Sequence, residues 1–93
     1  MSMYNVRIVL HDATWSDYTN MAEQLSRSGI VDVIQGGNGV RYKLPDAEYH
    51  YEGHATMDQV FEASKAAAAA TRRRYAVFIA EVSRCKWVGL DSV

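Results

Sequence analysis

One stretch of the chain decides the fold: Tyr4-Asn5-Val6-Arg7-Ile8-Val9-Leu10-His11. Its side chains alternate, so that one face is apolar and the opposite face, apart from one valine, is polar. A period of two is typical of a β-strand that buries a single face. The apolar face, which we expect to border the hydrophobic core, holds Tyr4, Val6, Ile8 and Leu10.

Two capping signals predict helices outside this strand. Thr14 is followed by Asp17, a weakened form of the capping box, and Thr56 is followed by Gln59, its usual form. Apolar residues then recur at helical spacing after each threonine. The pattern predicts helices over about residues 15–28 and 57–71.

The remaining apolar segments predict further strands. Residues 31–35 and 40–44 flank a Gly-Gly-Asn-Gly turn and form either a hairpin or one long kinked strand. Residues 47–52 alternate, and residues 75–82 are the most apolar segment. The resulting order, βαββαβ, predicts an α+β fold of the ferredoxin-like type: a four-stranded antiparallel sheet with two helices on one face.

Length and composition limit the function classes. The 93 residues predict one domain, 1–93, in which residues 83–93 form a tail that adds a short strand or wraps the domain edge. A hydrophobic content of 48% with 23% charged residues excludes a disordered chain and a membrane protein. The net charge is −1, so nucleic-acid binding would need a local basic patch.

Cysteine content and apolar run lengths indicate the compartment. Cys85 is the only cysteine, which excludes an intramolecular disulfide and a CxxC motif, and we interpret it as a packing residue rather than a nucleophile. The first residues lack the pattern of a secretory signal, and no apolar run has the length of a membrane span. We therefore expect a cytoplasmic protein with no membrane partner, and no motif indicates a cofactor.

His11 and Asp12 are the first candidates for chemistry. They end the first strand, where side chains emerge from a rigid element into solvent. As a hydrolytic pair, the imidazole would shuttle a proton while the carboxylate orients it or binds a cation. The alternative is structural: Asp12 starts a turn, and His11 is an exposed strand residue.

A row of imidazoles and carboxylates follows in the third predicted strand: Glu48, His50, Glu52 and, just beyond, His54. These groups are metal ligands in other proteins. Residues two apart on one strand lie about 7 Å from each other and need a further element to converge on one ion. We therefore expect a polar sheet face here and no metal site.

Arg72, Arg73 and Arg74 close the second predicted helix, and Arg84 and Lys86 lie further along the chain. As a functional feature, these side chains are candidates for contacts with nucleic-acid phosphates, next to aromatic residues that stack on bases. The alternative is that the three arginines only complement the negative end of the helix dipole.

Three stretches together resemble the small bacterial family that includes GhoS, the antitoxin of a type V toxin–antitoxin system. They are Val6 to Thr14 with Tyr18, Gly39 to Pro45 followed by Ala47-Glu48-Tyr49, and Tyr75-Ala76-Val77 with Trp87 to Leu90. The resemblance implies a ferredoxin-like fold related to the CRISPR-associated spacer-acquisition nucleases. It also implies an endoribonuclease that silences a toxin by cleaving its messenger RNA.

The resemblance carries two residues with it. The wider fold group tends to keep an acidic residue at the end of the first strand, which corresponds to Asp12. An arginine on the first helix is implicated in RNA cleavage by the antitoxin, and Arg27 is the only arginine on that predicted helix. The catalytic candidates are therefore Asp12, His11 and Arg27.

Two functions remain open. The leading hypothesis is an RNA-interacting protein, an endoribonuclease if the resemblance extends to activity. The alternative is a non-catalytic protein-interaction module that forms a homodimer. The last strand would supply its interface through Tyr75, Val77 and Ile79, because the helices of a monomer cover only one face of that strand. The competing arrangement is a tail that folds back over the same surface.

Overall fold

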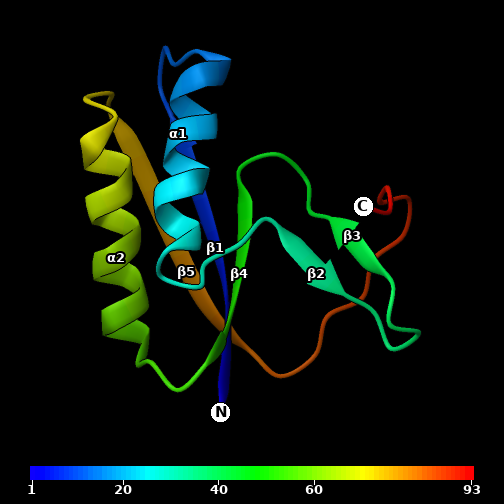
Figure 1. Cartoon of the computed structure of the whole chain (residues 1–93). Helices are drawn as coiled ribbons and strands as arrows, with labels where there is room; N and C mark the ends of the chain where they lie inside the picture. Colours follow the sequence, from blue (N-terminus) through cyan, green and yellow to red (C-terminus); the bar gives the residue numbers. More distant parts are fainter.

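Strand β1 (Ser2–Leu10) is the central strand of a three-stranded antiparallel sheet in the computed structural model, which describes residues 1–93. Its neighbours are β4 (Glu48–Gly53) and β5 (Tyr75–Val82), in the order β4-β1-β5 (Figure 1). The alternation predicted for β1 is confirmed. The buried side chains on its core face are Tyr4, Val6, Ile8 and Leu10.

The two helices are α1 (Trp15–Ser26) and α2 (Met57–Ala70), and they cover the same face of this sheet (Figure 1). Both predicted capping boxes are present: the side chains of Thr14 and Thr56 accept hydrogen bonds from the backbone N–H of Asp17 and Gln59. Each box fixes where its helix begins, so the apolar side of the helix faces the sheet.

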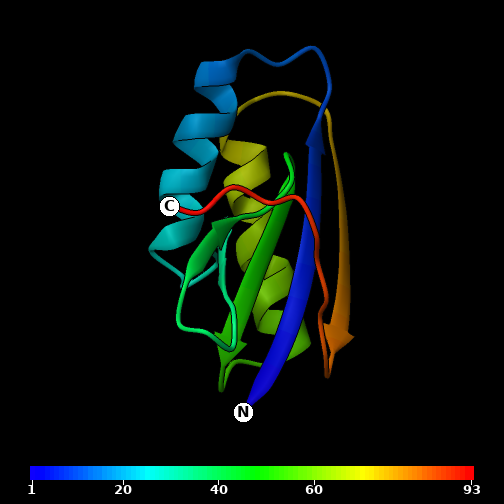
Figure 2. The ribbon, with the colours of Figure 1, turned by 90° about the vertical axis from the view of Figure 1, so that its right-hand side faces the viewer.

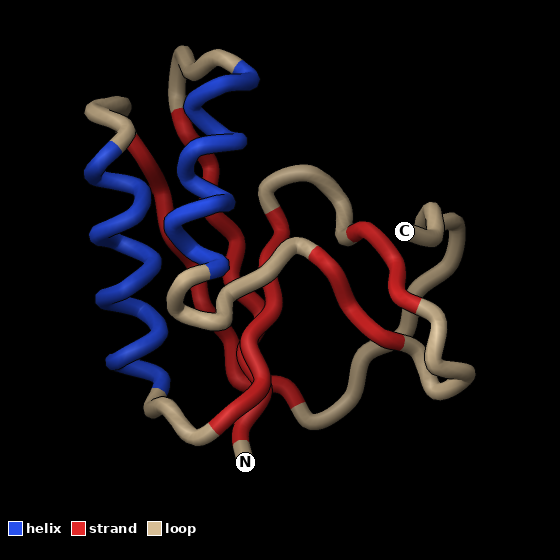
Figure 3. Tube along the Cα trace, in the orientation of Figure 1, coloured by secondary structure: helices blue, strands red, loops and turns tan.

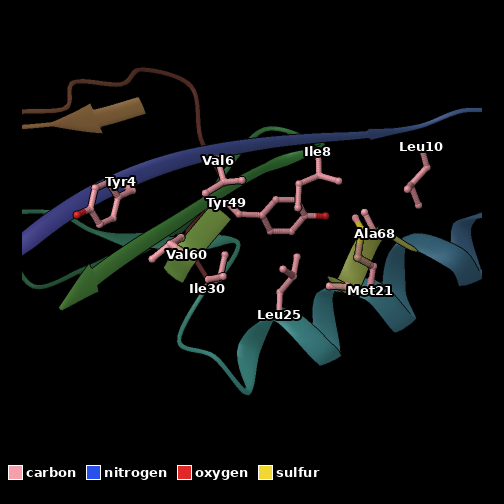
Figure 4. Packing of buried hydrophobic residues seen from close by; sticks show 11 residues of the cluster. Tyr4, Val6, Ile8, Leu10, Met21, Leu25, Ile30, Tyr49, Val60 and Ala68 are labelled. Atoms are coloured by element: carbon pink, nitrogen blue, oxygen red, sulfur yellow. The ribbon is translucent and has the colours of Figure 1, made fainter. Parts of the chain in front are cut away.

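The hydrophobic core lies between the sheet and the helices (Figure 4). Met21 and Leu25 of α1 and Val60 of α2 pack against the even-numbered residues of β1. Ala67 and Ala68, from the alanine run of α2, are also buried. Small side chains at these positions let α2 approach the sheet closely.

The segments predicted over residues 31–35 and 40–44 do not join the larger sheet. Strands β2 (Val33–Gln35) and β3 (Arg41–Lys43) pair with each other as a separate two-stranded sheet, so the hairpin interpretation is confirmed. Figure 3 shows this hairpin beside the larger sheet. Only one bridge, between Val31 and His50, links this region to β4. The single four-stranded sheet that the sequence predicted is therefore wrong, and the described fold is α+β with three and two strands.

The C-terminal tail pairs with the hairpin along β3. The N–H of Lys43 donates to the carbonyl of Asp91, and the N–H of Val93 donates to the carbonyl of Arg41. The tail thereby satisfies backbone groups of β3 that β2 does not bond. Trp87 packs beside Tyr42 with ring centroids 5.7 Å apart.

On its way to the hairpin, the tail crosses the sheet face opposite the helices, in front of β1 and β4 (Figure 2). The side-chain amide of Asn5 donates to Cys85 Sγ at 3.6 Å. The tail does not cover β5, where the Phe78 side chain remains 68% exposed. Neither helix has the length and apolar character needed to cross a bilayer.

Candidate nucleic-acid interface

Two loops meet at one end of the domain. The first follows β1 and carries His11 and Asp12; the second joins α2 to β5 and carries Arg72, Arg73 and Arg74 (Figure 1). The backbone N–H of His11 donates to the carbonyl of Arg74 at 2.8 Å. This bond extends the β1–β5 ladder by one pair and holds the two loops together. We call these five residues the loop end.

The backbone of the loop end is left-handed at two positions: Asp12 has a φ of 54° and Arg72 a φ of 61°. Aspartate adopts this conformation more readily than most residues, whereas arginine is strained in it. Arg72 directly follows Thr71, the C-cap of α2, and so occupies the position where glycine usually ends a helix. An arginine here costs about 1–2 kcal/mol relative to an unstrained conformation. Strain of this kind is found most often at functional sites.

The three arginines differ in their surroundings. Arg73 Nε lies 2.9 Å from Asp17 Oδ2, so an ion pair fixes its guanidinium against the start of α1. A backbone hydrogen bond from Thr14, with a further one from Arg73, lowers the pKa of Asp17 below its ordinary value. Arg72 and Arg74 are exposed and form no ion pair, so their guanidiniums are free to bind an anion.

Arg27 does not lie at the loop end. It is the C-cap residue of α1, and its guanidinium pairs with Glu23 at 3.4 Å. The 12 residues of α1 place it about 18 Å along the helix from the end that carries His11 and Asp12. The three catalytic candidates are therefore not assembled into one site.

Arg84 and Lys86 are also distant from the other three basic residues. They follow the far end of β5, whose 8 residues extend over about 26 Å. Lys86 lies over the sheet face that the tail crosses, beside Asn5 and Arg7. The predicted phosphate contacts thus form two separate groups, and only Arg72, Arg73 and Arg74 adjoin His11 and Asp12.

The structure places the proposed interface residues of β5 on the helix side. Val77 and Ile79 lie opposite Ile8 and Val6 of β1 and pack against the core cluster. Tyr75 lies on the same face, opposite Leu10, and is partly exposed. The apolar side chain that the monomer leaves uncovered is instead Phe78, on the opposite face. The alternation of β5 predicts two faces but not which of them the helices cover, so Phe78 could not be identified from the sequence as the uncovered side chain.

Two residues of the polar row on β4, Glu48 and His50, have partners within the protein, whereas Glu52 and His54 are exposed. Arg7 pairs with Glu48 at 2.6 Å, and His50 Nδ1 lies 2.8 Å from Asn5 Oδ1. His50 is only 6% exposed, and this burial lowers the pKa of its imidazole. No three His, Cys, Asp or Glu side chains lie close enough together to hold a metal ion.

Comparison with family models, with curated proteins and with solved structures finds no match to this chain.

Proposed function

We propose that the protein binds RNA at the loop end. The observation that carries this proposal is the 2.8 Å backbone hydrogen bond between His11 N–H and the Arg74 carbonyl, which joins the loop that carries the candidate proton-transfer residues to the loop that carries Arg72 and Arg74. Arg72 and Arg74 bind backbone phosphates, while the exposed ring of Tyr75 is adjacent and stacks on a base.

The resemblance to the GhoS family extends this proposal to cleavage of a messenger RNA. In such a step, Asp12 or His11 takes the proton from a ribose 2′-hydroxyl, whose oxygen attacks the adjacent phosphorus. The guanidinium of Arg72 or Arg74 stabilises the negative charge that develops on the phosphate oxygens. In this proposal these arginines take the role that the resemblance implied for Arg27, because Arg27 lies at the other end of α1.

We also propose that the fold is a reduced ferredoxin-like arrangement. The order β4-β1-β5 and the bridge between Val31 and His50 support it, because residue 31 stands where a fourth strand would flank β4. In this interpretation the segment before β2 keeps one pair with β4, between Val31 and His50. The rest of the expected second strand pairs with β3 in the hairpin instead.

The binding proposal is tested with a labelled single-stranded RNA of mixed sequence at several ionic strengths, read by fluorescence anisotropy. We expect the logarithm of the affinity to fall linearly with the logarithm of the salt concentration. The slope should become shallower by about 0.7 for each of Arg72 and Arg74 replaced by alanine. Arg27→Ala is the matched control and leaves the slope unchanged. An equal effect of Arg27→Ala would place the RNA elsewhere.

Cleavage is tested separately, by sequencing the ends produced when the protein is incubated with a messenger RNA pool. Asp12→Ala should abolish these ends. Ends that persist in Asp12→Ala would exclude Asp12 as the base, and the absence of ends with the intact protein would leave binding alone as the function.

A second candidate function, self-association, is favoured by the free edge of β5. Because His11 and Arg74 form a bonded pair of the β1–β5 ladder, alternate β5 residues direct their N–H and C=O groups away from β1. No other segment of the chain pairs with this edge. The residues with outward backbone groups are Tyr75, Val77, Ile79 and Glu81.

A second copy of the chain would pair with this edge in antiparallel orientation. The register that uses all four outward residues places Phe78 opposite Phe78 of the second copy. Phe78→Lys then sets like charges against each other without disturbing the core, since the side chain is exposed. Sedimentation equilibrium should show a dimer for the intact chain and a monomer for Phe78→Lys; a monomeric intact chain would exclude this assembly.

A further inference from the structure

A cavity of about 460 Å³ lies between α1 and the turn that connects β3 to β4. Its walls include the rings of Trp15, Tyr18 and Tyr49 and the methyl groups of Ala22 and Ala47. The volume is within the range of small-molecule sites, and aromatic walls are typical of them. The cavity is separate from the loop end, because it contains neither His11 nor any of the three arginines.

The aromatic walls are held in different ways. The hydroxyl of Tyr18 donates to the Leu10 carbonyl at 3.2 Å and accepts from the Leu10 N–H at 2.9 Å, which fixes the ring against the end of β1. The indole of Trp15, by contrast, is 76% exposed. A large exposed ring beside an apolar cavity can close over a bound molecule and exclude water from it.

The hydroxyl of Tyr49 has no partner within the protein. The residue is only 4% exposed, yet its oxygen forms no hydrogen bond and is not sealed from solvent. Figure 4 shows the Tyr49 ring between the sheet and α1, with the hydroxyl directed away from Tyr4. Burial, together with nearby Asp32, raises the pKa of Tyr49 to about 12, so the phenol is neutral near pH 7. The Tyr49 hydroxyl is therefore reached by solvent and free to hydrogen-bond a polar group of a molecule in the cavity that Tyr49 lines.

The charges around the cavity favour a cation. Three carboxylates line it, from Asp32, Asp46 and Glu48, against the single ammonium of Lys43. Lys43 lies 3.6 Å from Asp32, and Glu48 pairs with Arg7, so both carboxylates have protein partners. Asp46 has none. An anionic ligand would be repelled here, whereas an ammonium group can pair with Asp46 and donate to the Tyr49 hydroxyl.

We propose that this cavity binds a small molecule that carries a protonated primary amine on an aromatic body. The aromatic body lies against Trp15 and Tyr18, and the ammonium group is directed to Tyr49 and Asp46. The site is independent of the proposed RNA binding, since it shares no residue with the loop end.

Three probes of similar size separate the contribution of the charged group from that of the aromatic body. They are phenethylammonium, its neutral counterpart 2-phenylethanol, and the anion 3-phenylpropionate. Binding is followed by the indole N–H signals of the ¹⁵N-labelled full chain, assigned with Trp87→Phe. We expect phenethylammonium to shift the Trp15 signal saturably and to leave that of Trp87, which lies outside the cavity, in place. The neutral alcohol should bind about tenfold more weakly, because it lacks the charge-assisted hydrogen bonds. The anion should produce no shift.

Two variants test the residues directly. Asp46→Asn changes an exposed turn residue and should weaken phenethylammonium binding about tenfold while leaving 2-phenylethanol binding unchanged. Tyr49→Phe removes only the hydroxyl and should also weaken binding of the amine. Asp58→Asn, an exposed carboxylate on α2 outside the cavity, is the matched control. The proposal is overturned if the alcohol binds as tightly as the amine, if no probe shifts Trp15, or if both cavity variants bind like the intact chain.

Discussion

Replacing Arg72 by glycine should stabilise the protein while weakening RNA binding. Arg72 holds a φ of 61° directly after the C-cap of α2, and glycine adopts this conformation without steric cost. Relief of the strain contributes about 1–2 kcal/mol, of which about 0.4–1 kcal/mol is offset by the greater freedom of glycine in the unfolded chain. The expected net gain is centred on about 0.8 kcal/mol, or a rise of about 3–6 °C in the midpoint of thermal unfolding.

Arg72→Ala is the matched control for this prediction. Alanine keeps the Cβ and therefore the strain, but it lacks the guanidinium. Calorimetry should show a higher midpoint for Arg72→Gly than for the intact chain, with Arg72→Ala near the intact value. Anisotropy should show the same loss of RNA affinity in both variants. If Arg72→Gly is no more stable than Arg72→Ala, the backbone of Arg72 is not strained. If both variants bind RNA like the intact chain, Arg72 has no role in binding.

Three further outcomes follow from the packing and the pKa shifts. Leu25→Ala should lower the free energy of unfolding by about 2–5 kcal/mol in urea titration, whereas Val88→Ala, at an exposed tail position, should leave it unchanged. Tyr18→Phe should cost about 1–3 kcal/mol, because Leu10 loses both hydrogen bonds to the Tyr18 hydroxyl; an unchanged urea midpoint would contradict this. Because the pKa of Asp17 is lowered from 3.8 in the folded protein, its contribution to stability is present above that value and is lost as the pH falls through the folded pKa. Acid unfolding of Asp17→Asn should lack this part of the pH dependence, and a profile like that of the intact chain would show that Asp17 is not involved.

Local signals account for the parts of the fold that the sequence predicted. The alternation of β1 and the threonines that cap α1 and α2 act over a few residues, so tertiary contacts do not override them. The pairing of β2 is different. Val33–Gln35 pairs with β3, and β3 in turn bonds the tail, which reaches it from the other end of the chain. The alternation of apolar residues within β2 does not indicate which strand it pairs with.

The candidate site was predictable in its parts but not in its assembly. His11, Asp12 and the three arginines were each recognisable by residue type, yet their proximity depends on the antiparallel register of β1 and β5. Arg27 was also recognisable by residue type, but the length of α1 places it at the end of that helix away from His11 and Asp12. The cavity beside Tyr49 had no sequence signal, since its walls come from α1, the segment before β2, the end of β3, the turn after it and the start of β4.

The most direct test of RNA binding at the loop end is a titration of the ¹⁵N-labelled protein with single-stranded RNA, followed by backbone amide chemical shifts. The largest changes should fall on residues 11–14 and 71–75, which form the two loops joined by His11 and Arg74. Changes concentrated on the tail and the β2–β3 hairpin, or no changes at low salt, would contradict the proposal.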